Sequence, residues 1–303
     1  MTAPSPSERS AFVPAPPPGR RTAVLLLTCP DARGIVAAVA AFLSGHGANI
    51  VDVEQHTDAD EGLFFQRVEF ALDGFDLADD DVLPAFREVS EPFAMEVELR
   101  FPERVPRVAV LVSGQDHCLL DLLSRARTGE RVGDVVVVVS NHPDHQASCD
   151  FFGVPFHHLP VDGPGGKPAQ EQALVALLER ERVELVVLAR YMQVLGPDVV
   201  GRYPHRILNI HHSLLPAFVG AKPYHRAHAR GVKVIGATAH YATVELDQGP
   251  ILVQDVAAVT HRDSVEDLVA RGRDLEALVL ARAVKLHVAA KVLVHGGRAV
   301  VFG

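Results

Sequence analysis

The chain has 303 residues, which allows one large or two ordinary domains, and 48% of them are hydrophobic, enough for a sizeable core. Its formal net charge of −9, without any run of Lys and Arg, argues against a nucleic-acid-binding surface. The apolar runs are too short to span a bilayer, so we expect no membrane association.

The first 20 residues contain repeated prolines and no apolar stretch, a composition that predicts a disordered tail and not a signal peptide. Three cysteines, Cys29, Cys118 and Cys149, lack the spacing of a disulfide framework or a CxxC pair. Such cysteine usage is typical of a reducing compartment, and we therefore expect a cytoplasmic protein.

Residues 21–101 carry the pattern of one small domain. Strands are predicted at 22–28, 48–58, 62–72 and 94–101, and helices at 35–44 and 79–93. The order strand–helix–strand–strand–helix–strand is the ferredoxin-like arrangement.

Within this domain, the segment CPDARGIVAAVAAFLSGHGANIVDVEQ resembles the start of an ACT domain, a small-molecule regulatory module. The resemblance implies an effector site formed by the turn after the first strand and the start of the second. The residues assigned to it are Asp31, Arg33, Gly34, Asn49 and Ile50. Glycine or methionine is the effector that the resemblance suggests, and edge-to-edge pairing of ACT modules implies a homo-oligomer. The alternative is a dimerisation module that binds no ligand.

A proline-punctuated linker, residues 102–106, leads to a second domain at 107–303. Strands are predicted at 107–114, 133–141, 184–191 and 206–210, and helices at 116–130, 169–181 and 264–287. Alternation of this kind predicts a doubly wound, mostly parallel, Rossmann-like sheet. Residues 290–302 read as a terminal hairpin with a Gly-Gly turn.

Polar residues gather where the strands of this sheet should end. Asn209 and His211 are two apart on a predicted strand, so their side chains share one face. A second apolar run, 232–240, leads to Asp247. Because open α/β sheets bind ligands at the carboxyl ends of their strands, these groups would form an acid–base site with an oxyanion donor.

Other chemistries fit the sequence less well. The turn after the strand at 107–114 lacks GxGxxG, which argues against a nicotinamide cofactor. Adjacent histidines, as in His157-His158 and His211-His212, point to opposite sides of a strand, and no zinc spacing is present. We therefore expect no metal and no prosthetic group, and His142, His145, His157 and His158 are expected in loops or at strand edges. GxSxG is absent around Ser213, so a serine nucleophile is not indicated.

Four segments together resemble the formyltransferase fold group, which handles 10-formyltetrahydrofolate. They are NIHHSLLPAF, PYHRA, IGATAHY and LDQGPIL. The resemblance implies that Asn209, His211 and Asp247 are the catalytic residues. It also implies that the segment LARYMQVL and the loop 243–247 bind the folate. The substrate-binding residues expected on this basis are Arg190, Tyr191, Met192, Gln193, Val194, Leu195, His212, Ser213, His240, Thr243 and Leu246.

Members of this group transfer the formyl group to an amine or release it to water. The turn 114–117 contains Asp116, which would repel the phosphate of a phosphorylated acceptor. The acidic chain also lacks the basic surface that a tRNA substrate needs. An ACT module, and His212 in place of the transferases' proline, are typical of the group's deformylases.

We therefore expect hydrolysis of 10-formyltetrahydrofolate to formate and tetrahydrofolate, which supplies formate for purine biosynthesis and balances the folate pools. In this hypothesis Asp247 activates water directly or through His211, while Asn209 and protonated His211 stabilise the oxyanion. His212 either helps to hold the water or only supports the site. The alternatives are a formyltransferase with an unidentified amine acceptor and a non-catalytic folate or amino-acid sensor.

Overall fold

The computed structural model describes residues 21–162, 165–216 and 223–303, which form two compact units. One unit contains residues 21–104 and 289–303, and the other contains residues 105–288. The predicted disordered tail lies outside the described residues, as do residues 163–164 and 217–222.

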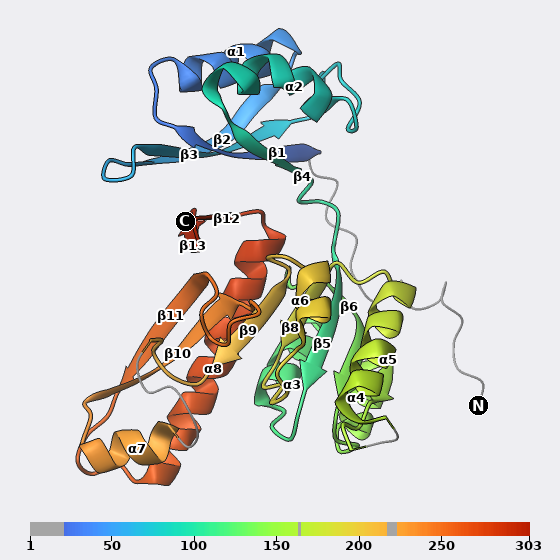
Figure 1. Cartoon of the computed structure of the whole chain (residues 1–303), viewed down its shortest axis with the longest axis vertical. Coiled ribbons are helices and arrows are strands. Elements are labelled where there is room, and N and C mark those ends of the chain that lie inside the picture. The colour runs from blue at the N-terminus through green and yellow to red at the C-terminus, as the bar shows by residue number, and fades with distance from the viewer. Residues whose placement is uncertain (1–20, 163–164, 217–222) are drawn as a thin grey trace. The chain divides into compact units, whose positions relative to one another are not determined.

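The first unit is the predicted ferredoxin-like domain. Its elements are β1 (Thr22–Pro30), α1 (Ile35–Gly45), β2 (Asn49–Asp58), β3 (Leu63–Ala71), α2 (Val82–Ser90) and β4 (Glu96–Arg100). The antiparallel sheet has the order β2-β3-β1-β4, with both helices on one face (Figure 1). Alternate residues of β1, including Leu25 and Leu27, pack beneath these helices with Val39, Phe70 and Phe86.

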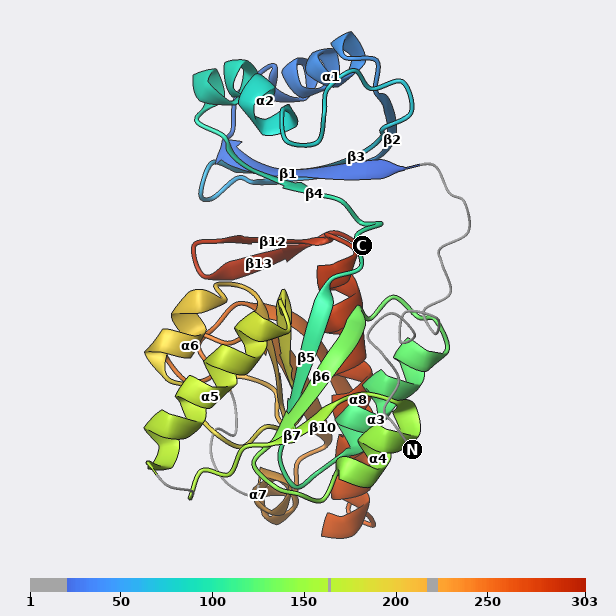
Figure 2. The same cartoon turned by 90° about the vertical axis from the view of Figure 1, so that its right-hand side faces the viewer.

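The opposite face of this sheet is covered by the end of the chain. The predicted hairpin is present as β12 (Val292–His295) and β13 (Arg298–Val301), and Figure 2 shows it across the sheet from the helices. Leu293 and Phe302 pack on Leu26 and Phe65. Its residues group with the first unit, whereas the predicted boundary had assigned them to the second domain. The hairpin belongs to the first unit because this face of β1 and β3 carries apolar residues, which are stabilised when the hairpin shields them from water.

The second unit is a seven-stranded sheet of order β11-β10-β9-β8-β5-β6-β7. Its strands are β5 (Arg107–Val112), β6 (Asp134–Ser140), β7 (Phe156–His158), β8 (Leu185–Leu188), β9 (Ile207–His211), β10 (Val234–Tyr241) and β11 (Ile251–Ala258). β7, β6, β5, β8 and β9 are parallel, and β10 and β11 pair antiparallel, as expected for a mostly parallel sheet.

Helices cover both faces of this sheet. They are α3 (His117–Arg127), α4 (Gln146–Phe152), α5 (Gly166–Arg180), α6 (Pro197–Arg202), α7 (Pro223–Arg230) and α8 (Val265–Val288). Figure 2 shows α5 and α6 on one face, and α3, α4 and α8 on the other. The chain moves outward from β5 through β6 to β7 and returns through β8, so the strand order reverses between β5 and β8. Ligands of such folds bind beside this reversal, at the carboxyl ends of the strands.

Five elements of the described chain were not predicted from the sequence: α4, α6, α7, β7 and β11. Among the described residues, no helix is long and apolar enough to cross a membrane.

Candidate active site

The antiparallel pair β9–β10 sets the positions of the polar residues. Asn209 is the cross-strand partner of His240, and His211 is the partner of Thr238. Cross-strand partners carry their side chains on the same face, so Asn209, His211 and His240 converge there. This convergence cannot be read from the sequence, because it depends on the register in which the two strands pair.

Asp247 reaches the same place on the loop between β10 and β11. Its φ of 58° lies in the left-handed region, which aspartate tolerates better than most residues. Two residues further on, a Cβ on Gly249 would stand 1.7 Å from the carbonyl oxygen of Tyr241. Only glycine allows the loop to return this closely along β10, and this explains the glycine of the LDQGP motif.

The structure brings the three predicted catalytic residues together. His211 Nδ1 lies 3.3 Å from Asp247 Oδ1, and Asn209 Nδ2 lies 3.1 Å from His240 Nε2. His240 Nε2 is also 3.7 Å from Asp247 Oδ1.

His240 orients the amide of Asn209. Its Nδ1 is 3.0 Å from the carbonyl oxygen of Tyr241 and must donate to it. Burial lowers the pKa of His240, and although the Tyr241 carbonyl and Asp247 raise it, the ring stays neutral. Nε2 is therefore an acceptor for one N–H of Asn209, and the second N–H of that amide is left for another acceptor.

His211 is buried beside Asp247 and offers one open nitrogen. Burial lowers its pKa more strongly than the charge of Asp247 raises it, so the imidazole is neutral near pH 7. Its Nδ1–H faces the carboxylate, which makes Nε2 the basic nitrogen. Among the described residues, Nε2 is buried and has no hydrogen-bond partner. Such an atom is poised to accept a proton from a bound molecule.

His212 adds a second imidazole. The ring centroids of His211 and His212 are 5.1 Å apart. Burial and the positive charge of Arg190 lower the pKa of His212 to about 4, so it is neutral at physiological pH. Its Nδ1 is likewise buried without a partner in the described part of the chain.

The loop after β9 is held by Thr238 on the neighbouring strand. The Thr238 hydroxyl donates to the Ser213 carbonyl at 2.8 Å and accepts the Leu215 N–H at 3.1 Å. Gln254 on β11 donates to the same oxygen at 3.0 Å. Ser213 is thereby a buried loop residue whose carbonyl has a structural partner.

The segment predicted to bind folate divides into core and surface residues. Tyr191 and Leu195 belong to the apolar core, and the Tyr191 hydroxyl accepts from Gln170 Nε2 at 2.7 Å. The alternation of the chain explains this, because Met192 and Val194 are 62% and 52% exposed. On the other predicted loop, Leu246 is 63% exposed and the Thr243 hydroxyl donates to the Glu245 carbonyl. Gln193 is partly exposed.

Arg190 turns away from this segment toward a buried carboxylate on α8. Arg190 Nε lies 3.2 Å from Glu276 Oε2 and 3.1 Å from Gln115 Oε1. His117 Nε2 lies 2.9 Å from Glu276 Oε2, and the Tyr224 hydroxyl donates to Glu276 Oε1 at 2.6 Å. Burial alone would raise the pKa of Glu276, but these partners together hold it below its ordinary value. Sequence analysis missed Glu276, His117 and Tyr224.

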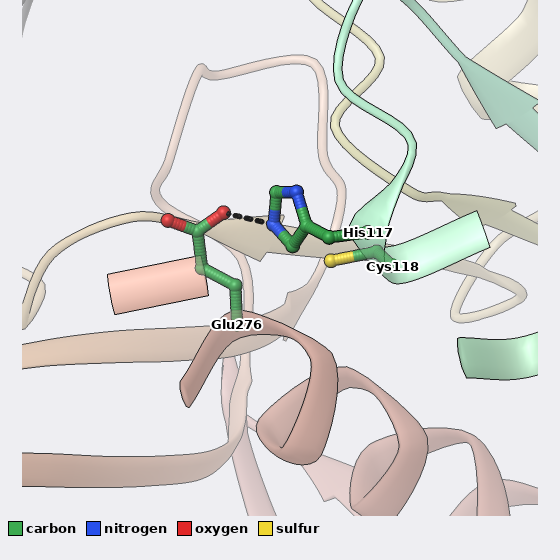
Figure 3. A group of neighbouring side chains, drawn as sticks. All are labelled: His117, Cys118 and Glu276. Atoms are coloured by element: carbon green, nitrogen blue, oxygen red, sulfur yellow. Dashed lines mark hydrogen bonds and ion pairs between the residues drawn. The ribbon is translucent and has the colours of Figure 1, made fainter. Parts of the chain in front are cut away.

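The same carboxylate belongs to a group that could be considered for a metal ion. Ligand atoms of His117, Cys118 and Glu276 lie within 4.8 Å of one another (Figure 3). However, Glu276 is already bound by the Arg190 guanidinium, whose charge repels a cation. Burial and the charge of Glu276 also raise the pKa of the Cys118 thiol, which keeps it protonated and a poor ligand. These residues do not fit a metal site.

In the first unit, the predicted effector residues occupy two separate places. Asp31, Arg33 and Gly34 form the exposed turn between β1 and α1, whereas Asn49 and Ile50 begin β2. Pro30 pairs with Leu63 at one end of β3, and Asn49 pairs with Ala71 at its other end. A single chain therefore does not bring the two halves of this predicted site together.

Comparison with known proteins agrees with both units. The ACT domain family model matches residues 23–91, and the formyl transferase family model matches residues 106–284. A formyltetrahydrofolate deformylase of Synechocystis sp. is 52% identical over 93% of this chain and 98% of that protein.

Solved structures give the same result. The crystal structure of a formyltetrahydrofolate deformylase from Pseudomonas syringae pv. tomato superposes with a TM-score of 0.90 at 43% identity, covering 98% of each chain. A glycinamide ribonucleotide transformylase from Symbiobacterium toebii matches at a TM-score of 0.63 and 34% identity, covering 66% of this chain and 95% of its own. The transformylase thus lacks a counterpart to a third of this chain, while the deformylase matches both units.

Proposed function

This chain belongs to the formyltetrahydrofolate deformylases, and we propose that Asn209, His211 and Asp247 carry out its hydrolysis of 10-formyltetrahydrofolate to formate and tetrahydrofolate. The observation that carries this assignment is the buried His211 imidazole, which is bound to Asp247 through Nδ1 and has no partner at Nε2 among the described residues. A neutral imidazole oriented by a carboxylate is a general base for water.

In the first step, water attacks the formyl carbon and His211 Nε2 takes its proton. Asp247 stabilises the imidazolium that forms, because its carboxylate lies 3.3 Å from Nδ1. The sequence left two routes for activating the water, directly by Asp247 or through His211, and this mechanism uses the route through His211. The second N–H of Asn209 donates to the developing oxyanion, which lowers the barrier by on the order of 3–4 kcal/mol.

In the second step, the C–N10 bond breaks and N10 must receive a proton to leave as an amine. Protonated His211 is the donor, since it has just acquired the proton of the water. Cleavage leaves tetrahydrofolate and formic acid, which gives up its proton to solvent and departs as formate, and His211 returns to its neutral form. No prosthetic group is assigned a part in these steps.

We assign the second buried imidazole, His212, to holding the attacking water. It adjoins His211 at 5.1 Å between ring centroids, and its pKa near 4 keeps it uncharged. A neutral imidazole can hydrogen-bond water without attracting it away from the formyl carbon as an ion would.

Exposed apolar side chains support the two loops as the folate-binding surface. Met192 and Val194 follow β8, and Val244 and Leu246 follow β10, all more than half exposed. Pteridine and aminobenzoate rings would cover these side chains, which accords with the apolar lining of small-molecule sites.

The wider roles follow from the reaction. We propose that the released formate feeds purine biosynthesis and that hydrolysis balances the one-carbon folate pools. The three cysteines, all buried and unpaired, fit a cytoplasmic enzyme. The ACT unit supports an amino-acid effector, glycine or methionine, and a homo-oligomer.

The test is formate release from 10-formyltetrahydrofolate without an added amine, comparing wild type with Asp247→Asn. We expect one formate for each tetrahydrofolate, and a loss of about 10²–10⁴-fold in kcat for the variant. Asp198→Asn, an exposed acid on α6, is the matched control and should retain full activity. Product formation only when an amine is supplied would identify a transferase instead.

A further inference from the structure

A cluster of buried and half-buried ionisable side chains adjoins His212 and takes no part in the steps above. The cluster consists of His117 on α3, Arg190 after β8, Tyr224 on α7 and Glu276 on α8. Glu276 is 1% exposed and lies at its centre. Side chains from three other segments of the unit thus converge on this one carboxylate.

We propose that Glu276 is a positioning residue for hydrolysis: by holding Arg190 and Tyr224 against His212, it fixes the imidazole that binds the attacking water. This inference rests on the proposed function, because it assumes that water is the nucleophile and that His212 holds it. It adds a residue from α8 that touches neither substrate nor water.

The first link runs through Tyr224. Its hydroxyl donates to Glu276 Oε1 at 2.6 Å, which fixes the ring in one orientation. The ring stands edge-on to His212, with 6.3 Å between centroids and 63° between planes. Since His212 Nδ1 has no protein partner among the described residues, its imidazole relies on packing, with the Tyr224 ring as one neighbour and the His211 ring as another.

The second link runs through Arg190. Its backbone has a φ of 63°, and its guanidinium is anchored by Glu276 and Gln115. The titratable groups that face His212 are Arg190, His211, Glu276 and Asp247, and after burial the largest influence on its pKa is the charge of Arg190, which favours the neutral ring. Without Glu276, the guanidinium would lose its buried counter-charge and its position.

Helix α8 is adapted to this arrangement. A Cβ on Gly272, one turn before Glu276, would lie 2.1 Å from the Tyr224 hydroxyl. Glycine is a poor helix former, so its presence inside α8 has a packing reason. It leaves room for the phenol to reach the carboxylate.

The experiment is a double-mutant cycle on Glu276→Gln and His212→Ala, measured as formate release under steady-state conditions. Glu276→Gln should lower kcat by about 10–100-fold, as removal of a supporting group does, with KM changed by less than about threefold. If Glu276 acts through His212, the double variant should be no slower than the slower single variant.

Two further variants keep the test decisive. Tyr224→Phe retains the ring and removes only the 2.6 Å hydrogen bond, so it replaces Glu276→Gln in the cycle if that variant fails to fold. Glu266→Gln, on the exposed first turn of the same helix, should match wild type.

Each outcome separates the inference from the function. Additive losses, or a lower melting temperature at unchanged kcat, would mean that Glu276 only stabilises the fold, while the hydrolase assignment stands. A wild-type enzyme that releases no formate would overturn the function and this inference with it.

Discussion

At the scale of single residues, the chemistry depends on which imidazoles are neutral. His211 and His240 each lie near Asp247, yet burial lowers both pKa values. In each case desolvation outweighs the attraction to the carboxylate. In the proposed mechanism, the carboxylate therefore orients His211 as a base instead of holding it as a resting cation.

This balance predicts the pH dependence of kcat/KM. His211 must be neutral to accept a proton, so activity should be full above its pKa and fall as pH drops through it. Because that pKa is lowered from about 6.5, the plateau should extend below pH 6.5. In Asp247→Asn the carboxylate no longer raises the pKa, so the residual activity should decline at a still lower pH. Measurement of kcat/KM from pH 4.5 to 8 checks this, and a limb above pH 6.5 would contradict it.

The residue scale also shows where sequence reasoning stops. Asn209, His211 and Asp247 were predicted from motif resemblance, and their approach to one another could be seen only in the structure. Glu276 was missed because an acid in a long helical pattern reads as solvent-facing. Its burial depends on Arg190 and His117, which come from other elements. The one sequence feature that could have indicated a buried Glu276 was Gly272, because glycine is unexpected inside a helix.

At the scale of elements, the long periodic segments were predictable and the short ones were not. The strands of the first unit and α8 follow their apolar patterns closely. Helices α4 and α6 and strand β7 have too few residues for a period to show. The hairpin β12–β13 was predicted from its Gly-Gly turn, but a local pattern does not say which sheet it will cover.

The loop from β10 to β11 provides a prediction at this scale. Gly249→Ala would place a methyl group 1.7 Å from the Tyr241 carbonyl oxygen, so the loop must move away from β10. Asp247 would move with it, and we expect kcat to fall about 100-fold, as a displacement near 1 Å does. Gly201→Ala on α6, where nothing lies within 4 Å, is the control and should be neutral. Formate release and thermal melting distinguish the two. Near-wild-type kcat for Gly249→Ala would show that the loop does not position Asp247.

At the scale of the whole molecule, the two units are joined twice along the chain, at 104–105 and at 288–289. The second connection returns the carboxyl terminus to the first unit. There the Arg67 guanidinium donates to the Ala290 carbonyl at 3.1 Å and pairs with Asp52 and Glu69. The first unit is therefore incomplete until the last residues have been made.

Deletion of residues 289–303 should accordingly destabilise the first unit. Leu293 and Phe302 would leave the apolar face of the sheet, at about 1.5–3 kcal/mol each. Calorimetry should show a lower-melting transition for the first unit, with that of residues 105–288 little changed. Val301→Ala, at an exposed position of β13, is a mild control. An unchanged pair of transitions would mean that the hairpin adds no stability.

The predicted effector site also belongs to this scale, because one chain does not complete it. The turn of Asp31 and Arg33 lies at the end of the sheet where β2 finishes with Asp58, while Asn49 starts β2 at the other end. Strand β2 is an edge strand of ten residues, with Val51 and Val53 exposed. If two copies pair antiparallel along β2, Asn49 of one copy meets the turn of the other, twice by symmetry.

Mixing of variants tests this arrangement. Asp31→Ala and Asn49→Ala should each abolish calorimetric binding of glycine or methionine in a homodimer. In a randomly mixed sample, half of the dimers are mixed and each keeps one intact site of two, so about a quarter of the sites should bind. If neither variant binds alone but about a quarter of the sites bind after mixing, each site must take residues from two chains. Full binding by a monomer would place the effector within one chain. No recovery of binding on mixing would exclude this site.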